Sequence, residues 1–384
     1  MFDLPTPEVS DEFAPLSPFM EARGYVPGGP VTRVPPGAEL DALREAVNDT
    51  REAVIASGTP DGVTTCDLIT LPYPTRFGLW RAATSPTPYL WITNRMVVVQ
   101  WMEGERRRTL LWEPSDHELG DRTPYFARLK AKNPLPERFL RTIHGTVLGH
   151  LQALGIAPED VDYLAFDHLH TQDVRRLIGT TQPAPDLGSL DEPIAAWFPN
   201  ARLITQEREW QALRHLHPLQ APWYQPETYT ALPTERLVNI DGDVVLGPGV
   251  ALIATPGHTA GNMSLVLNTD RGVWVSSENG IAAESWTPHA SSIAGVSKWA
   301  VEWGQDVILN ANTIEFAAWQ YDSMIAEALL ADPTPEGTFR QCFPSSELTA
   351  SRLSPGTSPT YTHERIEHGL VAPSRVVAAT GVPA

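Results

Sequence analysis

Two histidines separated by a single residue, His168 and His170, follow an apolar segment at residues 162–167. On an extended strand, side chains two residues apart point to the same side, so both imidazoles can face one cation. Asp173 lies three residues further on, where the chain must turn. A lone His-x-His pair is weak evidence because histidine is common on surfaces. This pair, however, is expected at the carboxyl end of a buried strand, where α/β sheets place their ligands, and it therefore indicates part of a metal site.

Two later segments supply further candidate ligands. His258 lies in a Pro-Gly turn between two apolar runs of residues 251–267, where a buried imidazole rarely lacks a partner. The alternative for His258 is a histidine bonded to a backbone carbonyl. Glu278 ends an apolar run, and a carboxylate leaving a buried strand is either paired or coordinating, because isolated burial would raise its pKa and neutralise it. The candidate metal ligands are therefore His168, His170, Asp173, His258 and Glu278.

Other histidines are expected to lie outside this site. His215 and His217 form a second His-x-His pair, but they end a predicted helix, where side chains two apart point in different directions. His363 and His368 are five residues apart, whereas a zinc-binding helix places its histidines four apart, so their segment is expected to be a solvated tail. His289 stays open as a residue that could touch the metal or the substrate.

The elements that must position these residues are helices and strands in a layered order. Helical patterns span residues 39–58, 135–156, 207–216, 298–305 and 314–332. Short β-branched or aromatic runs, typical of strands, lie within residues 64–115, 158–168, 201–206, 244–279 and 306–312. This order suits an α/β fold of the layered αβ/βα sandwich type better than a strictly alternating parallel sheet.

Several of these segments resemble the metallo-β-lactamase superfamily. Residues 151–170 are similar to the helix, acidic loop and strand that lead to the family's H-x-H-x-D-H motif, and residues 198–213 to its next strand and helix. Residues 255–265, T-P-G-H-T-A-G-N-M-S-L, are close to the family's T-P-G-H-T-x-G-x-x-S-L and are the most specific match. Residues 299–316 are similar to its final helix and strand. The resemblance covers roughly residues 65–330 and implies a four-layer αβ/βα sandwich and a metal-dependent hydrolase.

Departures from the family motif change the metal site that the resemblance implies. In register with the motif, Gln172 stands at the aspartate position and Asp173 at the third histidine position. Glu278 replaces the family's bridging aspartate. The last histidine corresponds to Asn312, or to Asn310 if the strand ends earlier. The second metal position has therefore lost both of its imidazoles.

What carries over is the three-histidine face of the first metal position, formed by His168, His170 and His258. Three neutral imidazoles with an open position suit zinc, while added carboxylates move the balance toward iron or manganese. We expect one firmly bound ion, with a second one weak or absent. Such an ion lowers the pKa of a bound water. Asp173 and Glu278 are the expected catalytic carboxylates, the first to deprotonate that water and the second to bridge or to orient an imidazole.

The expected substrate is a small hydrophobic or aromatic molecule, such as a lactone, an ester or an activated aryl compound. Tryptophans near the expected mouth favour flat apolar substrates, although packing in the core is the better explanation for them. They are Trp223, Trp286, Trp299 and Trp303. Two alternatives stay open: a binding or structural subunit without catalysis, and an iron-dependent redox enzyme on the same fold.

Composition excludes several other classes of protein. In a chain of 384 residues, 42% are hydrophobic and 19% are charged, so a substantial core can form. The formal net charge of −18 repels phosphate backbones and anionic lipid, which disfavours nucleic acid and membrane partners. Two cysteines cannot form a disulfide framework. Without a secretory signal or a membrane-spanning apolar run, a cytoplasmic protein is expected.

Proline divides the chain into three expected parts. The 36 prolines are concentrated at the ends and in connections. This distribution predicts an N-terminal arm and helix at residues 1–60, a catalytic domain at 61–334 and a C-terminal tail at 335–384. The arm or the tail could also bind a partner or a second subunit.

Overall fold

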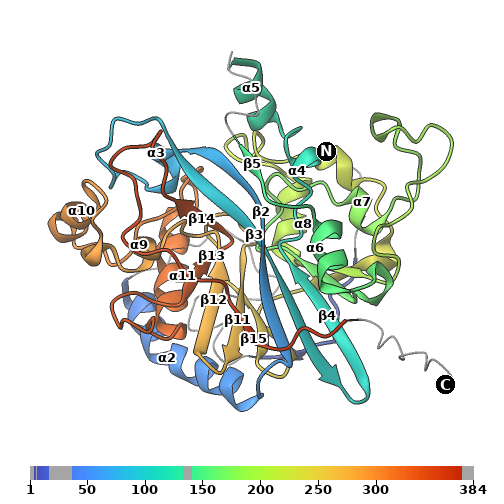
Figure 1. The fold of residues 1–384 in the computed structure, drawn as a ribbon, viewed down its shortest axis with the longest axis horizontal. Helices are drawn as coiled ribbons and strands as arrows, with labels where there is room; N and C mark the ends of the chain where they lie inside the picture. Colours follow the sequence, from blue (N-terminus) through green and yellow to red (C-terminus); the bar gives the residue numbers. More distant parts are fainter. Residues whose placement is uncertain (1–3, 6, 17–36, 133–140, 374–384) are drawn as a thin grey trace, which may run out of the picture.

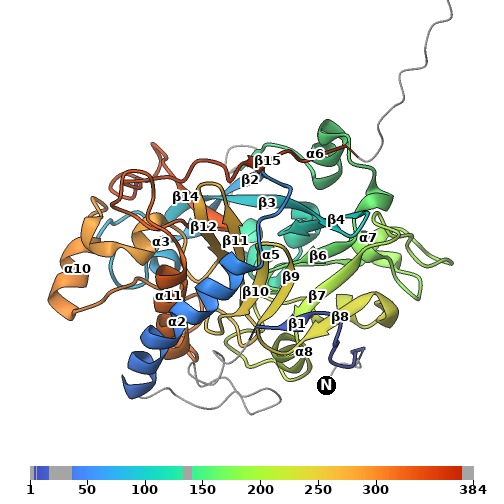
Figure 2. The ribbon, with the colours of Figure 1, turned by 90° about the horizontal axis from the view of Figure 1, so that it is seen from below.

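Two β-sheets pack face to face, and helices cover the outer face of each sheet (Figures 1 and 2). The computed structural model describes residues 4–5, 7–16, 37–132 and 141–373. Most of the predicted arm, residues 17–36, lies outside the described residues.

The first sheet combines an antiparallel and a parallel part. The antiparallel part consists of β2 (Gly62–Pro74), β3 (Tyr89–Glu103) and β4 (Arg106–Trp112). The parallel part continues from β4 through β6 (Tyr163–Ala165) and β7 (Arg202–Gln206) to β8 (Leu237–Ile240). Short strands complete it: β5 (Thr142–Ile143) and β15 (His368–Gly369) pair with β2, and β14 (Ser346–Thr349) pairs with β3.

The second sheet is antiparallel from β1 (Ala14–Pro15) through β9 (Val244–Gly247), β10 (Val250–Ala254) and β11 (Met263–Thr269) to β12 (Gly272–Ser277). β13 (Cys342–Pro344) then pairs in parallel with β12. β10 is buried at every position because both faces of this sheet are covered. Between the sheets, Val99 and Leu110 share one core cluster with Leu252 and Leu265.

Two pairs of helices form the outer layers. α2 (Gly37–Ala56) and α11 (Ala317–Leu330) cover the second sheet, where Val47 and Met324 share a cluster with Val266. α6 (Val147–Leu154) and α8 (Glu207–Arg214) cover the first, where Leu151 and Trp210 share a cluster with Leu164. The order helix, sheet, sheet, helix confirms the predicted four-layer αβ/βα sandwich.

Shorter helices lie in the connections. They are α3 (Thr75–Gly78), α4 (His117–Gly120), α5 (Pro124–Lys132), α7 (Arg175–Ile178), α9 (Ala283–Trp286) and α10 (Val296–Trp303). Single 3₁₀ turns span Pro158–Asp160, Pro185–Leu187, Pro226–Tyr229, Thr234–Arg236 and Pro288–Ala290. Among the described helices, none combines the length and the apolar composition that crossing a bilayer requires.

Two predicted elements differ in the structure. In place of one helix over residues 135–156, residues 142–143 form β5 and α6 begins only at Val147, because the Thr146 hydroxyl accepts the amide of Gly149 and caps the helix there. Residues 133–140 lie outside the described residues. The predicted strand at 306–312 is a loop, since its backbone bonds to single residues of several connections and to side chains rather than to a neighbouring strand.

The C-terminal segment also differs from a detached tail. Residues 342–349 cross from one sheet to the other, since β13 pairs with β12 and β14 with β3. The predicted solvated segment around His363 is wrong as well: this imidazole is buried, bonded to a carboxylate oxygen of Glu347 and to the carbonyl of Arg340. The three-part division of the chain stays a prediction.

Candidate metal centre

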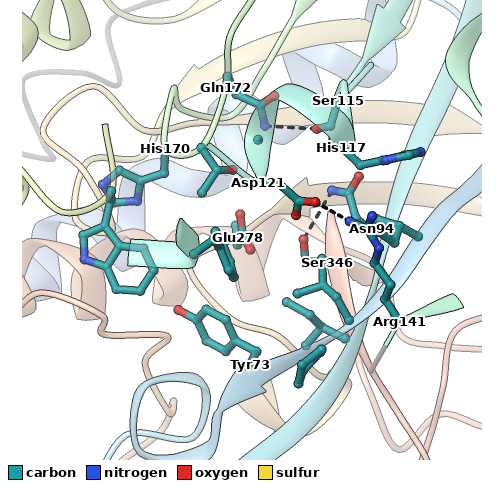
Figure 3. A pocket seen from close by; sticks show the side chains of 18 of the residues that line it. Tyr73, Asn94, Ser115, His117, Asp121, Arg141, His170, Gln172, Glu278 and Ser346 are labelled. Atoms are coloured by element: carbon teal, nitrogen blue, oxygen red, sulfur yellow. Dashed lines mark hydrogen bonds and ion pairs between the residues drawn. The ribbon is translucent and has the colours of Figure 1, made fainter. Parts of the chain in front are cut away.

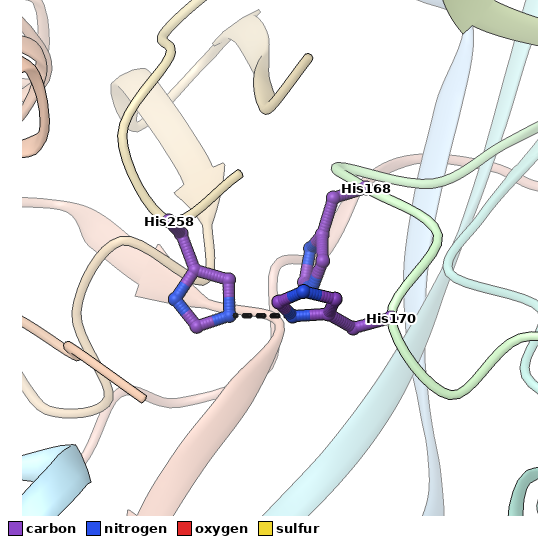
Figure 4. Close-up of side chains that lie close together, drawn as sticks. All are labelled: His168, His170 and His258. Carbon is purple, nitrogen blue, oxygen red and sulfur yellow. Dashed lines mark hydrogen bonds between the residues drawn. The ribbon is translucent and has the colours of Figure 1, made fainter. Parts of the chain in front are cut away.

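Three imidazoles from two distant stretches of chain meet at one end of the sandwich (Figure 4). His168 and His170 follow β6, and His258 lies in the loop between β10 and β11. All three side chains are buried, and one ring nitrogen of each lies within 4.8 Å of the others. The structure therefore brings together the three histidines that the sequence singled out.

The opposite nitrogen of each ring is held by a hydrogen bond. His168 Nδ1 lies 2.5 Å from Asp167 Oδ1, His170 Nε2 lies 2.5 Å from the Gln220 side-chain oxygen, and His258 Nδ1 lies 2.8 Å from the carbonyl oxygen of Asn310. These partners are acceptors, so each ring donates its proton away from the cluster. The nitrogens that remain are His168 Nε2, His170 Nδ1 and His258 Nε2, and each offers a lone pair when its ring is neutral.

This donor set fits a cation. His170 Nδ1 and His258 Nε2 lie 3.3 Å apart, and two lone pairs at that distance repel unless a proton or a metal ion lies between them. Outward N–H groups anchored on a carboxylate and on carbonyls are the arrangement that fixes metal-bound histidines. Three imidazoles from one side leave an open coordination position, as catalytic zinc sites do.

Electrostatics keep two of the rings neutral. Burial, together with the charge of His168, lowers the pKa of His258 to about 3 and holds the pKa of His170 well below its usual value. For His168, burial lowers the pKa, but the adjacent Asp167 carboxylate outweighs burial and raises it to about 9. Because a metal ligand must be unprotonated, His170 and His258 could coordinate an ion at neutral pH, whereas His168 would first have to lose a proton.

Glu278 lies beside this cluster. Its Oε2 is 3.9 Å from His168 Nε2, and Asp167, His168 and Glu278 form a second group whose ligand atoms lie within 4.8 Å. Burial raises the pKa of Glu278 to about 7; the charge of Asp167 adds to this effect and His168 opposes it. A carboxyl group with such a pKa can both accept and return a proton near neutrality.

Asp173 is not brought into either group of possible ligands among the described residues. Arg175 takes up both of its oxygens, with Nε 3.0 Å from Oδ1 and Nη2 2.7 Å from Oδ2. The same guanidinium also pairs with Asp186. These contacts do not favour the predicted catalytic or metal-binding role of Asp173, and they indicate that its carboxylate holds the turn after the histidines.

The Asp173→Asn variant is therefore expected to lose stability rather than metal. The Asp173 side chain is fully buried against Arg175, and weakening its hydrogen bonds costs about 1–3 kcal/mol, because Asp186 still pairs with the guanidinium. Denaturant unfolding of the two proteins measures that loss, and elemental analysis should find the same metal content in both. A variant with full stability but no metal would instead make Asp173 a ligand.

Of the other residues that the sequence left open, some lie at the histidine cluster and others lie away from it. Asn312 Nδ2 lies 3.4 Å from His170 Nδ1, whereas Asn310 contributes its backbone carbonyl to His258. The Gln172 side chain donates to the Ser115 hydroxyl at 3.0 Å (Figure 3). His289 is exposed and lines a different cavity.

Sequence reasoning missed the residues that orient the histidines. Asp167 and Gln220 hold two of the rings, as described above. Glu209 of α8 ties both histidine loops together: its carboxylate accepts the amide of Leu169 at 2.8 Å and the hydroxyl of Thr259 at 2.8 Å. Adjacency to His168 was the one available signal for Asp167, whereas Gln220 and Glu209 come close only in the folded chain.

The three histidines open into a cavity of about 480 Å³ (Figure 3). Much of its wall is apolar: Ile69, Leu71, Ile92, Phe126, Leu129 and Trp223. Polar groups gather on another part of the wall: Asn94, Ser115, Asp121, Lys130, Arg141 and Ser346. The Trp223 ring stacks on Tyr125 with centroids 4.1 Å apart, which holds this part of the wall rigid. The cavity suits a small molecule with a substantial apolar part.

Comparison with known proteins gives relatives of one kind. No protein-family model matches the chain. An N-acyl homoserine lactonase of Bacillus sp is 30% identical over 125 residues, which are 33% of this chain and 40% of the relative. The chain thus spans about 40% of the length of this curated relative. Over one third of the chain the sequence is thus similar to a protein named as a lactonase, which agrees with the predicted resemblance to hydrolases.

Solved structures with similar architecture are also hydrolases. The dizinc quorum-quenching lactonase AidC, in complex with a product, has a TM-score of 0.46 and 12% identity over 79% of this chain and 94% of that one. AbOPH, a hydrolase of the β-lactamase superfamily, has a TM-score of 0.40 and 16% identity over 71% of this chain and 84% of that one.

Proposed function

We propose that the protein is a metal-dependent hydrolase that opens a lactone or cleaves an ester with a hydrophobic or aromatic part. The observation that carries this proposal is the convergence of three imidazole lone pairs at a cavity with largely apolar walls. The lactonase activity named for the Bacillus sp relative agrees with it.

The ligands of the ion would be His168 Nε2, His170 Nδ1 and His258 Nε2. Zinc suits three imidazoles best, with iron or manganese as alternatives if Glu278 also coordinates. We infer one firmly bound ion and a weak or absent second one, because Asp173 is engaged by Arg175 and the Gln172 amide by Ser115. A bound ion of this kind supplies Lewis acidity, which acidifies water and polarises a carbonyl.

The proton transfers would fall to Glu278. Its pKa of about 7 lets it take a proton from the attacking water and return it to the leaving oxygen. Asn312 Nδ2, beside His170, can donate to an oxygen of the substrate. The apolar wall would bury the hydrophobic part of the substrate and exclude bulk water.

Removal of the metal is expected to abolish hydrolysis and to lower Tm. A ligand that binds only the folded state stabilises it by about 4 kcal/mol at a thousandfold excess over Kd. Elemental analysis of the purified protein, followed by hydrolysis of dihydrocoumarin and thermal unfolding before and after chelation, measures both effects. Adding zinc back should restore both.

The same measurements separate the alternatives. A binding or structural subunit would hold substoichiometric metal and gain no thermal stability from it. Stoichiometric iron with visible absorbance would favour the redox enzyme. If the metal-loaded protein hydrolyses neither lactones nor esters, the proposed function is wrong. A cytoplasmic location and an oligomer formed through the arm or the tail stay predictions.

A further inference from the structure

A second cavity, of about 710 Å³, adjoins the one that holds the histidines. Tyr89 and Asn312 line both cavities, and Asn312 is the residue beside His170. Ala311 precedes Asn312 in the chain and follows Asn310, whose carbonyl holds His258; its amide donates to the carbonyl of Phe77 at 3.0 Å, and both Ala311 and Phe77 line the second cavity. A ligand in the second cavity would therefore lie close to Asn312, the residue beside His170.

The second cavity carries positive charge. Arg76 and Arg81 line it, and no carboxylate is among its described lining residues. Across the part of the chain that the structure describes, neither guanidinium has an ion-pair partner, and their ring contacts are with Phe77 and Trp80. In a chain with a net charge of −18, two uncompensated cations on one cavity are a specific attraction for an anion.

Both arginines are held in place by aromatic rings. Arg76 Cζ lies 4.5 Å from the centroid of the Phe77 ring, and Arg81 Cζ lies 4.5 Å from that of Trp80. Stacking fixes a guanidinium plane while leaving its N–H edges free to donate to an oxyanion. Arg81 also has a φ of 60°, in the left-handed region that residues other than glycine rarely adopt. Such a conformation persists only where the surroundings fix it, which is common at binding sites.

Aromatic side chains complete the wall: Phe77, Trp80, Tyr89 and Tyr125. We propose that this second cavity is an anion subsite, which binds a carboxylate or sulfonate carried on an aryl or apolar arm of the substrate while the scissile carbonyl faces the histidines. The inference rests on the proposed function and narrows its substrate class from apolar esters and lactones to those bearing an oxyanion.

Kinetics with a matched pair of substrates test the subsite. The metal-loaded protein is compared on dihydrocoumarin and on 6-carboxydihydrocoumarin, as wild type and as Arg76→Gln/Arg81→Gln. The double variant is expected to raise KM about tenfold for the carboxylated lactone and less than about twofold for the neutral one, since charge-assisted hydrogen bonds are lost only with the former. The preference of the wild type for the carboxylated over the neutral lactone should be weaker at high salt than at low salt, because both arginines are exposed.

Two further variants serve as controls for this experiment. Arg107→Gln removes a charge from an exposed arginine on β4 that lines neither cavity, and it is expected to leave both KM values unchanged. Arg76→Gln alone should raise KM for the carboxylated lactone by an intermediate factor, which keeps the test valid if the double variant folds poorly. Equal changes in KM for the two lactones would overturn the inference.

Calorimetry separates the subsite from the activity. The metal-loaded wild type is expected to bind 2-naphthoate at least tenfold more tightly than 2-naphthamide, and the double variant is expected to lose this difference. Suppose that the wild type hydrolyses no lactone but binds naphthoate more tightly than naphthamide, and that the double variant does not. The subsite would then stand and the proposed function would be wrong. Naphthoate binding that survives in the double variant but disappears in His170→Ala would assign the anion to the metal and overturn the subsite.

Discussion

Replacing His170 with alanine is expected to weaken metal binding by more than about 100-fold and to reduce hydrolysis by a similar factor or more. Partners that only orient a ligand are worth about 10–100-fold in metal affinity, so the loss of a ligand must exceed that range. The His170 ring is one of the three that supply an inward lone pair, and Gln220 holds it in the coordinating orientation. Competition with a chromophoric chelator gives the affinity, and turnover of dihydrocoumarin gives the activity.

The chain offers a matched control for this experiment. His215 belongs to the other His-x-His pair and is exposed after α8. His215→Ala should therefore keep both metal affinity and hydrolysis. Unchanged activity in a folded His170→Ala protein would end the metal-centre proposal.

The Asp167→Asn variant is expected to lose about 10–100-fold in metal affinity, although Asp167 is not among the proposed ligands. Its carboxylate is buried, accepts the proton of His168 Nδ1 and raises the pKa of that ring to about 9. A neutral amide removes a negative charge next to the cation, and its NH₂ group can turn toward His168 and favour the wrong tautomer. Chelator competition and thermal unfolding measure affinity and folding separately.

Ser345→Ala provides the graded comparison. The Ser345 hydroxyl donates to Asp167 Oδ2 at 2.7 Å, so its removal loosens the carboxylate without breaking the bond to His168. We expect a smaller loss of affinity than in Asp167→Asn. A wild-type affinity in Asp167→Asn would mean that packing alone orients His168.

The convergence of the three histidines could be predicted from local patterns. His168 and His170 are two residues apart after an apolar run, and His258 lies in a turn between two apolar runs. These patterns locate strand ends, and strand ends meet at one edge of the sandwich. Which nitrogen of each ring faces inward could not be predicted, since it depends on the partners of the opposite nitrogen, such as Gln220, 50 residues from His170.

The interpretation of Asp173 shows the limit of reasoning from a motif register. The register put Asp173 at a ligand position, but Arg175, two residues further on, takes both of its oxygens. An arginine so close to an aspartate is itself a local signal, and it competes with a metal for the same carboxylate. The motif register alone could not tell whether the Asp173 carboxylate binds a metal ion or pairs with Arg175.

The strands β13 and β14 could not be predicted from the sequence because they are short. β13 and β14 have three and four residues, too few to establish a period of two, and they lie in a segment rich in proline and serine. Their pairing with β12 and β3 depends on neighbours that are far away in the sequence.

The crossing of residues 342–349 between the sheets sets an order of assembly. Ser345 lies at that crossing and bonds to the carboxylate that orients His168. During synthesis on the ribosome, the strands that carry all three imidazoles emerge well before this segment does. The three imidazoles can therefore come together before Ser345 is available, and the bond from Ser345 to the carboxylate beside His168 is added only after residue 345 has been synthesised.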